Sequence, residues 1–235
     1  MERLYKYSML EHAIAMVKRG RFRIGTLYEY RNVEIHGSAI GDVEEGTFKT
    51  ILDAKEQTSF SLDDGSPEAT YFNHHWLQGP GRGKAVRIVL KPKVKLTAIT
   101  NTEDMYVFCV STRFDRKAML EFGYNACVVI EQPGRFLHAL SRALRHVAVF
   151  EGFGPIVYSS RESDYLTPHK IHPALLKGSE YAYQAEGRAL WKPSGQVVEP
   201  FFATCRRAAR YCSLMNPNFA VNGDGPRAAR ALPLR

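Results

Sequence analysis

Gln184 and Glu186 stand two residues apart in residues 183–191, a segment whose alternating residue types predict a β-strand. In a strand, residues i and i+2 point to the same face, so this amide and this carboxylate would share one site. The pair suits a reaction at a sugar, because a carboxylate can hold a ribose hydroxyl and stabilise positive charge at the anomeric carbon while an amide orients the nucleophile. The alternative interpretation is a surface strand on which Glu186 pairs with Arg188 on the same face.

Three other groups of residues have types that could do chemistry, and none has the required spacing. The histidines of residues 169–172 and 74–75 lack the i, i+4 spacing of a zinc pair and have no Cys or acidic residue nearby, so we predict no metal site. Ser111 lacks the G-x-S-x-G context of a serine nucleophile. The glycine-rich residues 79–83 precede a predicted strand rather than a helix, so they predict a hairpin loop and not a phosphate site.

Length and composition fit a protein that folds around a core of its own. The chain has 235 residues, of which 45% are hydrophobic. No segment approaches the roughly 18 apolar residues of a membrane span, and the N-terminus does not resemble a signal peptide, so we expect a cytoplasmic protein without membrane contact. The four cysteines include no C-x-x-C pair, which predicts reduced, structural thiols.

Positive charge is concentrated near the C-terminus. The chain carries +8 in total, and residues 205–235 hold six arginines against Asp224 alone, a net charge of +5. Residues 205–215 predict a short basic helix, and 216–235 a flexible tail of Pro, Gly, Ala and Arg. We therefore divide the chain into a domain at 1–204 and this C-terminal segment. Such a tail can contact phosphates, the acidic surface of a partner, or neither.

The elements that must position these side chains begin with a strand at residues 4–7. Ser8 and Glu11 have the spacing of a capping box and predict the start of a helix that ends at Gly20. A strand follows from Phe22.

The rest of the chain predicts more strands than helices. Residues 35–46 combine glycines with acids and predict a mobile acidic loop, and residues 47–62 predict a pair of strands. Hydrophobic patterning predicts further strands at 85–90, 105–112, 126–130, 147–149 and 156–158, and helices at 116–122 and 133–146. No dinucleotide-binding or P-loop motif occurs, so neither of those folds is supported.

Three short motifs follow one another along the chain. They are Tyr5-Lys6-Tyr7-Ser8 on the first strand, Ser111-Thr112 at the end of an apolar strand, and Gln184-Ala185-Glu186. Over residues 4–191 this order resembles the ADP-ribosyltransferases, including DarT-like and CmdT-like toxin and phage-defence enzymes, and a bacterial DUF2971-like group. The resemblance implies an α+β fold in a single domain, with mixed, mostly antiparallel split β-sheets and a few helices.

The resemblance also implies roles for individual residues. Lys6 stands where the family has His or Arg, Ser8 matches a hydroxyl two residues later, Ser111 or Thr112 matches the second motif, and Glu186 the third. Glu186 would stabilise the sugar cation formed as nicotinamide leaves NAD, and Gln184 would position the acceptor. The remaining residues of the implied NAD site are Tyr5 and Tyr7, Arg23 and Arg31 with Lys6 for the pyrophosphate, and Tyr28 and Tyr30 for ring stacking.

The acceptor and the partners are expected from charge and from the resemblance. The basic tail and the aromatic residues beside arginines favour transfer to an RNA or DNA base. Two alternatives are a protein side chain as the acceptor, and a non-enzymatic module of a phage-defence system that binds a nucleotide or a partner protein. Lys6 in place of His favours the module. A toxin-like enzyme would also fit an antitoxin or chaperone partner.

Overall fold

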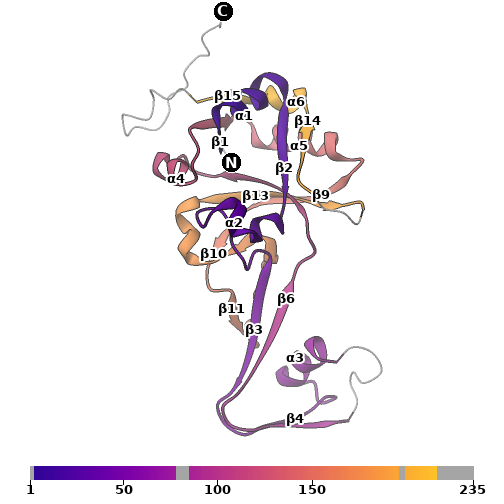
Figure 1. The fold of residues 1–235 in the computed structure, drawn as a ribbon. Coiled ribbons are helices and arrows are strands. Elements are labelled where there is room, and N and C mark those ends of the chain that lie inside the picture. The colour runs from indigo at the N-terminus through magenta and orange to yellow at the C-terminus, as the bar shows by residue number, and fades with distance from the viewer. Residues whose placement is uncertain (1–2, 78–84, 196–198, 216–235) are drawn as a thin grey trace, which may run out of the picture. The chain divides into compact units, whose positions relative to one another are not determined.

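The computed structural model describes residues 3–77, 85–195 and 199–215, and its chain divides into two compact units. Unit 1 comprises Met1–Glu29, Met105–Pro155 and Tyr183–Arg235, and unit 2 comprises Tyr30–Asp104 and Ile156–Ala182. The predicted α+β class, with mostly antiparallel open sheets and few helices, is confirmed (Figure 1). The glycine-rich residues 79–83 and the tail at 216–235 lie outside the described residues.

Unit 1 is built on an antiparallel sheet of eight strands. Its path runs β14-β2-β7-β1-β8-β15, with β13 paired to β7 and β9 paired to β13. The strands are β1 (Leu4–Ser8), β2 (Arg21–Thr26), β7 (Tyr106–Ser111), β8 (Ala126–Ile130), β9 (Ala148–Pro155), β13 (Glu186–Pro193), β14 (Phe201–Thr204) and β15 (Cys212–Leu214). The expected strands near 4–7, 22–24, 105–112 and 126–130 are all present.

One edge of β7 is shared by two strands. The other edge pairs with β13 over the whole length of β7, from Tyr106 to Ser111. On the shared edge, β2 pairs only with Tyr106 and Val107, whereas β1 pairs only at Ser111. The two strands therefore diverge beside Phe108, Cys109 and Val110, and this fork splits the sheet. Backbone groups of β7 at the fork need partners other than a neighbouring strand.

Helix α5 (Pro133–Leu144) covers one face of the sheet of unit 1. Its apolar stripe, Phe136, Leu140 and Leu144, is buried in a cluster with side chains of β2, β7, β8 and β13. The ring of Phe136 lies 5.3 Å from that of Phe22 and 5.5 Å from that of Phe108. The same cluster takes in the helix that runs through α1 (Leu10–Ile14) and the π-helical η1 (Ala15–Arg19) and stops at Gly20, as predicted.

The opposite face carries a smaller cluster beneath helix α4 (Arg116–Glu121), which lies within the helix predicted at 116–122. Tyr5 and Tyr7 of β1 pack there against Met119 and Phe114. The Tyr7 hydroxyl donates to Arg113 O at 3.1 Å and accepts from Asp115 N at 2.7 Å, and burial raises its pKa to about 12. Asp115 in turn caps α4 through its carboxylate.

Two local predictions for unit 1 are wrong. Ser8 does not cap the first helix, because it stays in β1 and donates to Met9 O. The acceptor for Leu10 N is instead the side chain of Asn125, which is distant in the sequence. Residues 205–215 do not form one helix. After a single turn, α6 (Arg206–Ala209), the chain pairs as β15 with β8.

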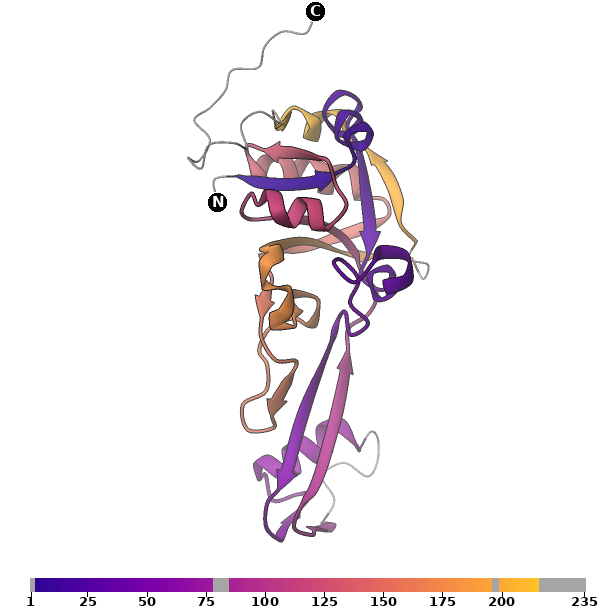
Figure 2. The ribbon, with the colours of Figure 1, turned by 60° about the vertical axis from the view of Figure 1, so that its left-hand side comes forward.

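Unit 2 is organised around an antiparallel ribbon of β3 (Thr47–Ala54) and β6 (Val94–Asn101) (Figure 2). Strand β11 (Glu162–Asp164) pairs with β3, β4 (Thr58–Ser61) with β5 (Arg87–Leu90), and β10 (Val157–Tyr158) with β12 (Leu176–Lys177). The two strands expected in 47–62 are therefore correct, but each has a different partner from the one predicted. The helical elements of unit 2 are α2 (Val33–His36), α3 (Pro67–His75) and η3 (Pro173–Leu175), while η2 (Glu29–Arg31) and η4 (Ser179–Gln184) each include residues of both units.

Helix α3 begins where local chemistry requires it. Ser66 accepts a hydrogen bond from Ala69 N at the N-terminus, and Pro67 occupies the first helical position. Tyr71 then fixes the helix to the ribbon, since its hydroxyl lies 2.9 Å from Thr50 O and accepts from Ala98 N at 3.1 Å. In the part of the chain that the structure describes, no helix is long and apolar enough to cross a membrane.

Candidate functional site

Residues from the three sequence motifs lie side by side on adjacent strands of unit 1. Tyr5 of β1 is the register partner of Ser111 of β7, and Ser111 is the register partner of Glu186 of β13. Directly opposite residues in antiparallel strands point to the same face of a sheet. The motifs at 5–8, 111–112 and 184–186, which lie far apart in the sequence, therefore converge on one row.

The backbone entering this row is held by the hydroxyls of the second motif. Ser111 Oγ lies 2.6 Å from Arg113 O and 3.1 Å from Gln184 O. Thr112 Oγ1 donates to Ala185 O at 2.9 Å, and Thr112 N donates to the same oxygen at 2.8 Å. Both hydroxyls thus hold the two residues before Glu186, so their chemistry at this site is to position the backbone next to the carboxylate.

Gln184 does not share a strand face with Glu186. It is the last residue of the 3-10 helix η4, and Ala185, at φ 44°, turns the chain before β13 begins at Glu186. A non-glycine residue in this left-handed region breaks the alternation on which the strand prediction rests. Gln184 is nevertheless buried next to the row, with its backbone oxygen accepting from Ser111.

Glu186 forms a buried ion pair with Arg188 of the same strand. Arg188 Nε lies 2.7 Å from Glu186 Oε1, and its second nitrogen lies 3.3 Å from Oε2. The two side chains are 9% and 1% exposed. The pairing of these two residues was the alternative to a sugar site, but it occurs in the interior and not on a surface strand. The arginine contacts both carboxylate oxygens and fixes the orientation of the carboxylate.

Lys6 extends from β1 into the fork. Its Nζ donates to Cys109 O at 2.7 Å and lies 4.9 Å from the centre of the Phe108 ring, so the ammonium satisfies backbone that the diverging strands leave open. Burial lowers the pKa of Lys6; Cys109 and the carboxylates of Glu186 and Glu29 oppose this shift. Lys6, Glu29 and Glu186 are therefore close enough to interact electrostatically within unit 1.

The other unit 1 residues implied by the resemblance have their own contacts. Arg23 forms a two-pronged pair with Glu29, at 2.9 and 2.8 Å, with the arginine side chain 41% exposed. Tyr5, Tyr7 and Ser8 are buried in β1. Tyr28 follows β2 and is partly buried.

The last two implied residues, Tyr30 and Arg31, belong to unit 2. The Tyr30 ring lies 5.1 Å from that of His36. Arg31 Nε donates to Glu45 O at 2.8 Å. Arg31 is therefore engaged with the protein's own backbone.

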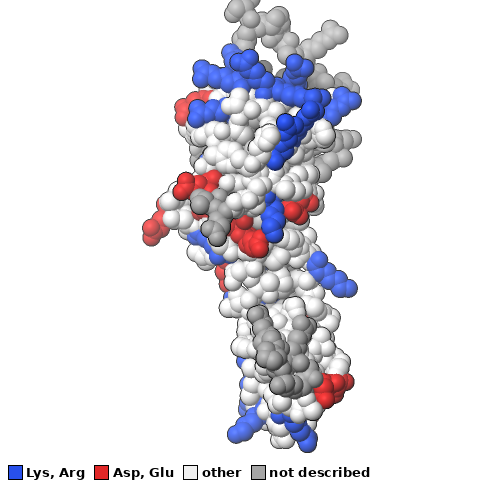
Figure 3. All heavy atoms as spheres, turned by 90° about the vertical axis from the view of Figure 1, so that its right-hand side faces the viewer, with Lys and Arg blue, Asp and Glu red and all other residues white. Residues whose placement is uncertain are grey.

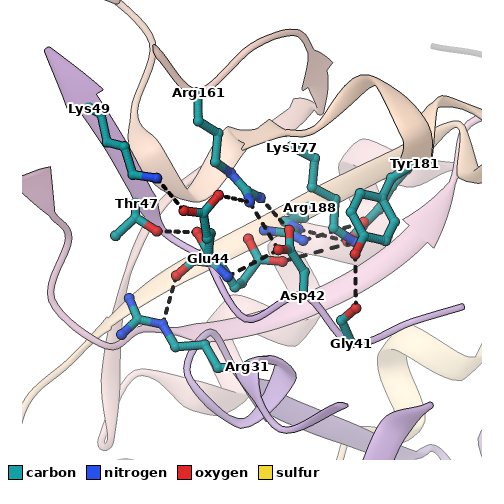
Figure 4. A network of polar contacts seen from close by, with 12 residues as sticks. Arg31, Gly41, Asp42, Glu44, Thr47, Lys49, Arg161, Lys177, Tyr181 and Arg188 are labelled. Carbon is teal, nitrogen blue, oxygen red and sulfur yellow. Dashed lines mark hydrogen bonds and ion pairs between the residues drawn. The ribbon is translucent and has the colours of Figure 1, made fainter. Parts of the chain in front are cut away.

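The segment predicted as a mobile acidic loop is instead anchored by buried ion pairs of unit 2 (Figure 4). Arg161 pairs with both carboxylate oxygens of Asp42, and Lys177 Nζ lies 3.9 Å from Glu45. Burial lowers the pKa of Arg161, but its hydrogen bonds to Asp42 outweigh this and raise it overall. The sequence prediction fails because the cations that hold these acids lie more than a hundred residues away.

Exposed cations form a basic surface on unit 1. Helix α6 packs against both η1 and α5, which brings their outer faces together. Blue side chains gather over the end of unit 1 that carries α6 (Figure 3). None of the members forms an ion pair with a described residue; they are Lys18, Arg19, Arg21, Arg135, Arg142, Arg145, Arg206, Arg207 and Arg210. The basic α6 was predicted from the sequence, whereas its association with η1 and α5 was not.

Comparisons with protein-family models, with curated proteins and with solved structures find no match to this chain. Among the described residues, no group of three or more His, Cys, Asp or Glu side chains is placed to hold a metal ion.

Proposed function

We propose that this protein is an NAD-dependent ADP-ribosyltransferase that modifies a nucleic-acid base. The observation that carries the proposal is the row Tyr5, Ser111 and Glu186, in register across three adjacent strands. These three residues are distant in the sequence, and only the pairing of the strands makes them neighbours. Their convergence, with two hydroxyls holding the backbone before a buried carboxylate, supports a site acting on a ribose, because a carboxylate fixed in this way can stabilise charge at the sugar.

In the proposed reaction, the bond between the anomeric carbon of NAD and the nicotinamide nitrogen breaks, and nicotinamide leaves with the bonding electrons. The anomeric carbon gains positive charge, which the Glu186 carboxylate stabilises while accepting a hydrogen bond from the ribose. A nitrogen or oxygen of the acceptor then bonds to that carbon and loses its proton to solvent. Arg188 orients the Glu186 carboxylate, and the buried Gln184 would hold the acceptor.

The basic surface supports a nucleic-acid acceptor. Phosphate groups bind clustered Lys and Arg with release of counterions, and the nine cations of this surface are exposed and not paired with acids of the described chain. A protein side chain as the acceptor needs no such surface. From the family resemblance we also propose a role as a toxin or in phage defence, with an antitoxin or chaperone as the protein partner.

The transfer step is tested with labelled NAD, RNA and single-stranded DNA, with cell extract as a source of protein acceptors. We expect label in nucleic acid, and Glu186→Gln should reduce the initial rate about 100- to 1000-fold. The matched control is Glu151→Gln, an exposed glutamate on the neighbouring strand β9 with no contact to the row. Normal transfer by Glu186→Gln at equal folded concentration would refute the role of Glu186. Label in protein alone would show that the acceptor is a protein side chain and not a nucleic-acid base.

The acceptor is tested separately by binding. Replacing Arg206, Arg207 and Arg210 with Gln removes three charges, and each lost phosphate contact lowers the slope of log K against log salt by about 0.9 for duplex and 0.7 for single strands. The control with the same charge change replaces three exposed lysines of unit 2 with Gln: Lys91 and Lys93, which precede β6, and Lys95, which lies in it. Equal salt slopes for both triple variants would show that the basic surface does not contact phosphates.

A second candidate, a non-enzymatic nucleotide-binding module, is favoured by one specific observation. The Lys6 ammonium donates to Cys109 O, so the residue that the resemblance expects at the pyrophosphate of NAD is engaged with the protein's own backbone. Saturable NAD binding without release of nicotinamide, measured in the presence of RNA, DNA and extract, is the outcome that selects the module over the enzyme.

A further inference from the structure

Unit 2 contains a cavity of about 610 Å³ that the transferase proposal does not use. Its walls come from the ribbon (Phe48, Thr50 and Thr100), from helix α3 (Tyr71 and His75) and from the segment after β11 (Tyr165 and His169). Phe48 and Thr100 are register partners on the ribbon. A cavity of this size is in the range of sites that take small organic ligands.

The walls of the cavity are aromatic rings set at steep angles to one another. Phe48 and His169 lie 5.9 Å apart at 78°, Tyr71 and Tyr165 lie 5.8 Å apart at 63°, and Tyr71 and His75 lie 5.0 Å apart at 60°. The Tyr71 hydroxyl is tied to the ribbon, and that of Tyr165 donates to Glu68. The rings are therefore held in place by their own contacts and offer both faces and edges to a flat ligand.

The described lining residues include no Lys, Arg, Asp or Glu. Burial, and then the neighbouring His74, lower the pKa of His75, so its imidazole is neutral at pH 7. Burial and the Glu68 carboxylate raise the pKa of Tyr165 to about 12, so its hydroxyl stays protonated. An ionised group would lose its hydration in this cavity without gaining an opposite charge. The chemistry of the walls thus selects an uncharged ligand.

The cavity also offers hydrogen bonds. Nε2 of His169 is buried and has no hydrogen-bond partner among the described residues. Buried polar atoms are nearly always hydrogen-bonded, so this nitrogen, on a residue of the cavity wall, is a group with which a bound ligand would pair. The hydroxyls of Thr50 and Thr100 add groups that both donate and accept.

We propose that this cavity binds an uncharged nucleobase, carried by a free nucleoside or by an unstacked residue of a single strand. A nucleobase has the flat ring that the aromatic walls can stack against and the polar edge that His169 and the threonines can bond. The proposal rests on unit 2 alone and does not require the transferase activity.

The test is equilibrium binding of the full chain to the four ribonucleosides, to pentanucleotides of each base, and to ribose as the ligand without a base. We expect saturable binding of at least one nucleoside with a Kd between micromolar and millimolar, and no saturation by ribose. Tighter binding of the matching pentanucleotide that is lost in Thr100→Trp identifies a single strand as the source, whereas nucleoside binding that is lost in Thr100→Trp without tighter pentanucleotide binding identifies a free nucleoside. Failure of all nucleosides and pentanucleotides to saturate would overturn the proposal.

Two variants locate the binding. His169→Phe keeps a flat ring but removes the nitrogen, and we expect at least tenfold weaker binding. Thr100→Trp fills the cavity from the ribbon and should abolish binding. His138→Phe, at an exposed position of α5 in unit 1, is the matched control and should bind as the parent does. Thermal unfolding establishes that each variant is folded; unchanged affinity in folded His169→Phe and Thr100→Trp would place the ligand elsewhere and refute the proposal.

Discussion

Glu186→Gln should destabilise the protein as well as inactivate it, because Arg188 would keep its charge in the interior without a carboxylate. The Arg188 side chain is 1% exposed, and the two groups are joined at 2.7 and 3.3 Å. Removing one partner of such a buried pair costs about 3–5 kcal/mol. Glutamine still offers Oε1 to Arg188 Nε, so we expect a loss of about 3 kcal/mol. A domain with a typical stability of about 5–15 kcal/mol stays folded after this loss.

The Glu186→Gln/Arg188→Met double variant removes the uncompensated charge together with its partner. We expect it to be more stable than Glu186→Gln by at least about 2 kcal/mol, since methionine in place of Arg188 leaves no unpaired charge in the interior. Urea unfolding measures both effects. With a slope of about 1–3 kcal/mol/M, a loss of about 3 kcal/mol moves the midpoint by about 1 M or more.

Glu151→Gln is the control for the chemical change alone, and its free energy of unfolding should stay within about 0.5 kcal/mol of the parent. If Glu186→Gln is as stable as Glu151→Gln, the ion pair does not hold the start of β13. If the double variant is no more stable than Glu186→Gln, the leftover arginine charge is not the cause of the loss. Either result would refute the reasoning, whatever the rate of transfer.

Three further predictions address other parts of the fold. Gly20→Ala should lower the free energy of unfolding by more than about 1 kcal/mol in urea, because Gly20 has φ 68° and a Cβ there would lie 2.7 Å from the backbone of Cys205, whereas Gly134→Ala, with open space in α5, should not destabilise. Lys49 and, less strongly, Arg161 lower the pKa of Glu44 below its usual 4.5. The contribution of Glu44 to stability is therefore complete above pH 4.5 and is lost as the pH falls through the lowered pKa. Glu44→Gln should remove that part of the acid dependence of unfolding. Burial raises the pKa of Cys109, Cys127 and Cys212 to about 12, so iodoacetamide at pH 8 should label them more slowly in the native protein than in urea, and equal rates would contradict their burial.

Elements whose signal is local could be predicted from the sequence. The apolar strands at 105–112 and 126–130 and the helix at 133–146 carry periodic patterns of their own, and the structure has β7, β8 and α5 there. Gly20 ends its helix because the chain there needs a left-handed residue. These predictions need no knowledge of distant residues.

The predictions that are wrong concern segments whose conformation depends on contacts with residues far away in the sequence. Ser8 and Glu11 have the spacing of a capping box, but Asn125 supplies the acceptor for Leu10 N. The acids near 42–45 have the composition of a loop, but Arg161 and Lys177 bury them. At the candidate site, Ala185 turns the chain because Thr112 holds its carbonyl oxygen. The order of the three motifs was readable, whereas the register that aligns Ser111 with Glu186 depends on pairing between strands.

The buried Glu186–Arg188 pair bears on function because it is a poor way to gain stability. Replacing such a pair with apolar side chains of similar volume is often neutral or stabilising, so the fold alone gives little reason for two charges in this part of the sheet. The same pair beside Ser111 supplies an oriented and largely desolvated carboxylate, and a group held in this way is suited to stabilise a sugar cation. The stability of the double variant therefore separates two explanations of one structure. A stable double variant without transfer activity assigns the pair to chemistry, whereas an unstable one assigns it to the fold.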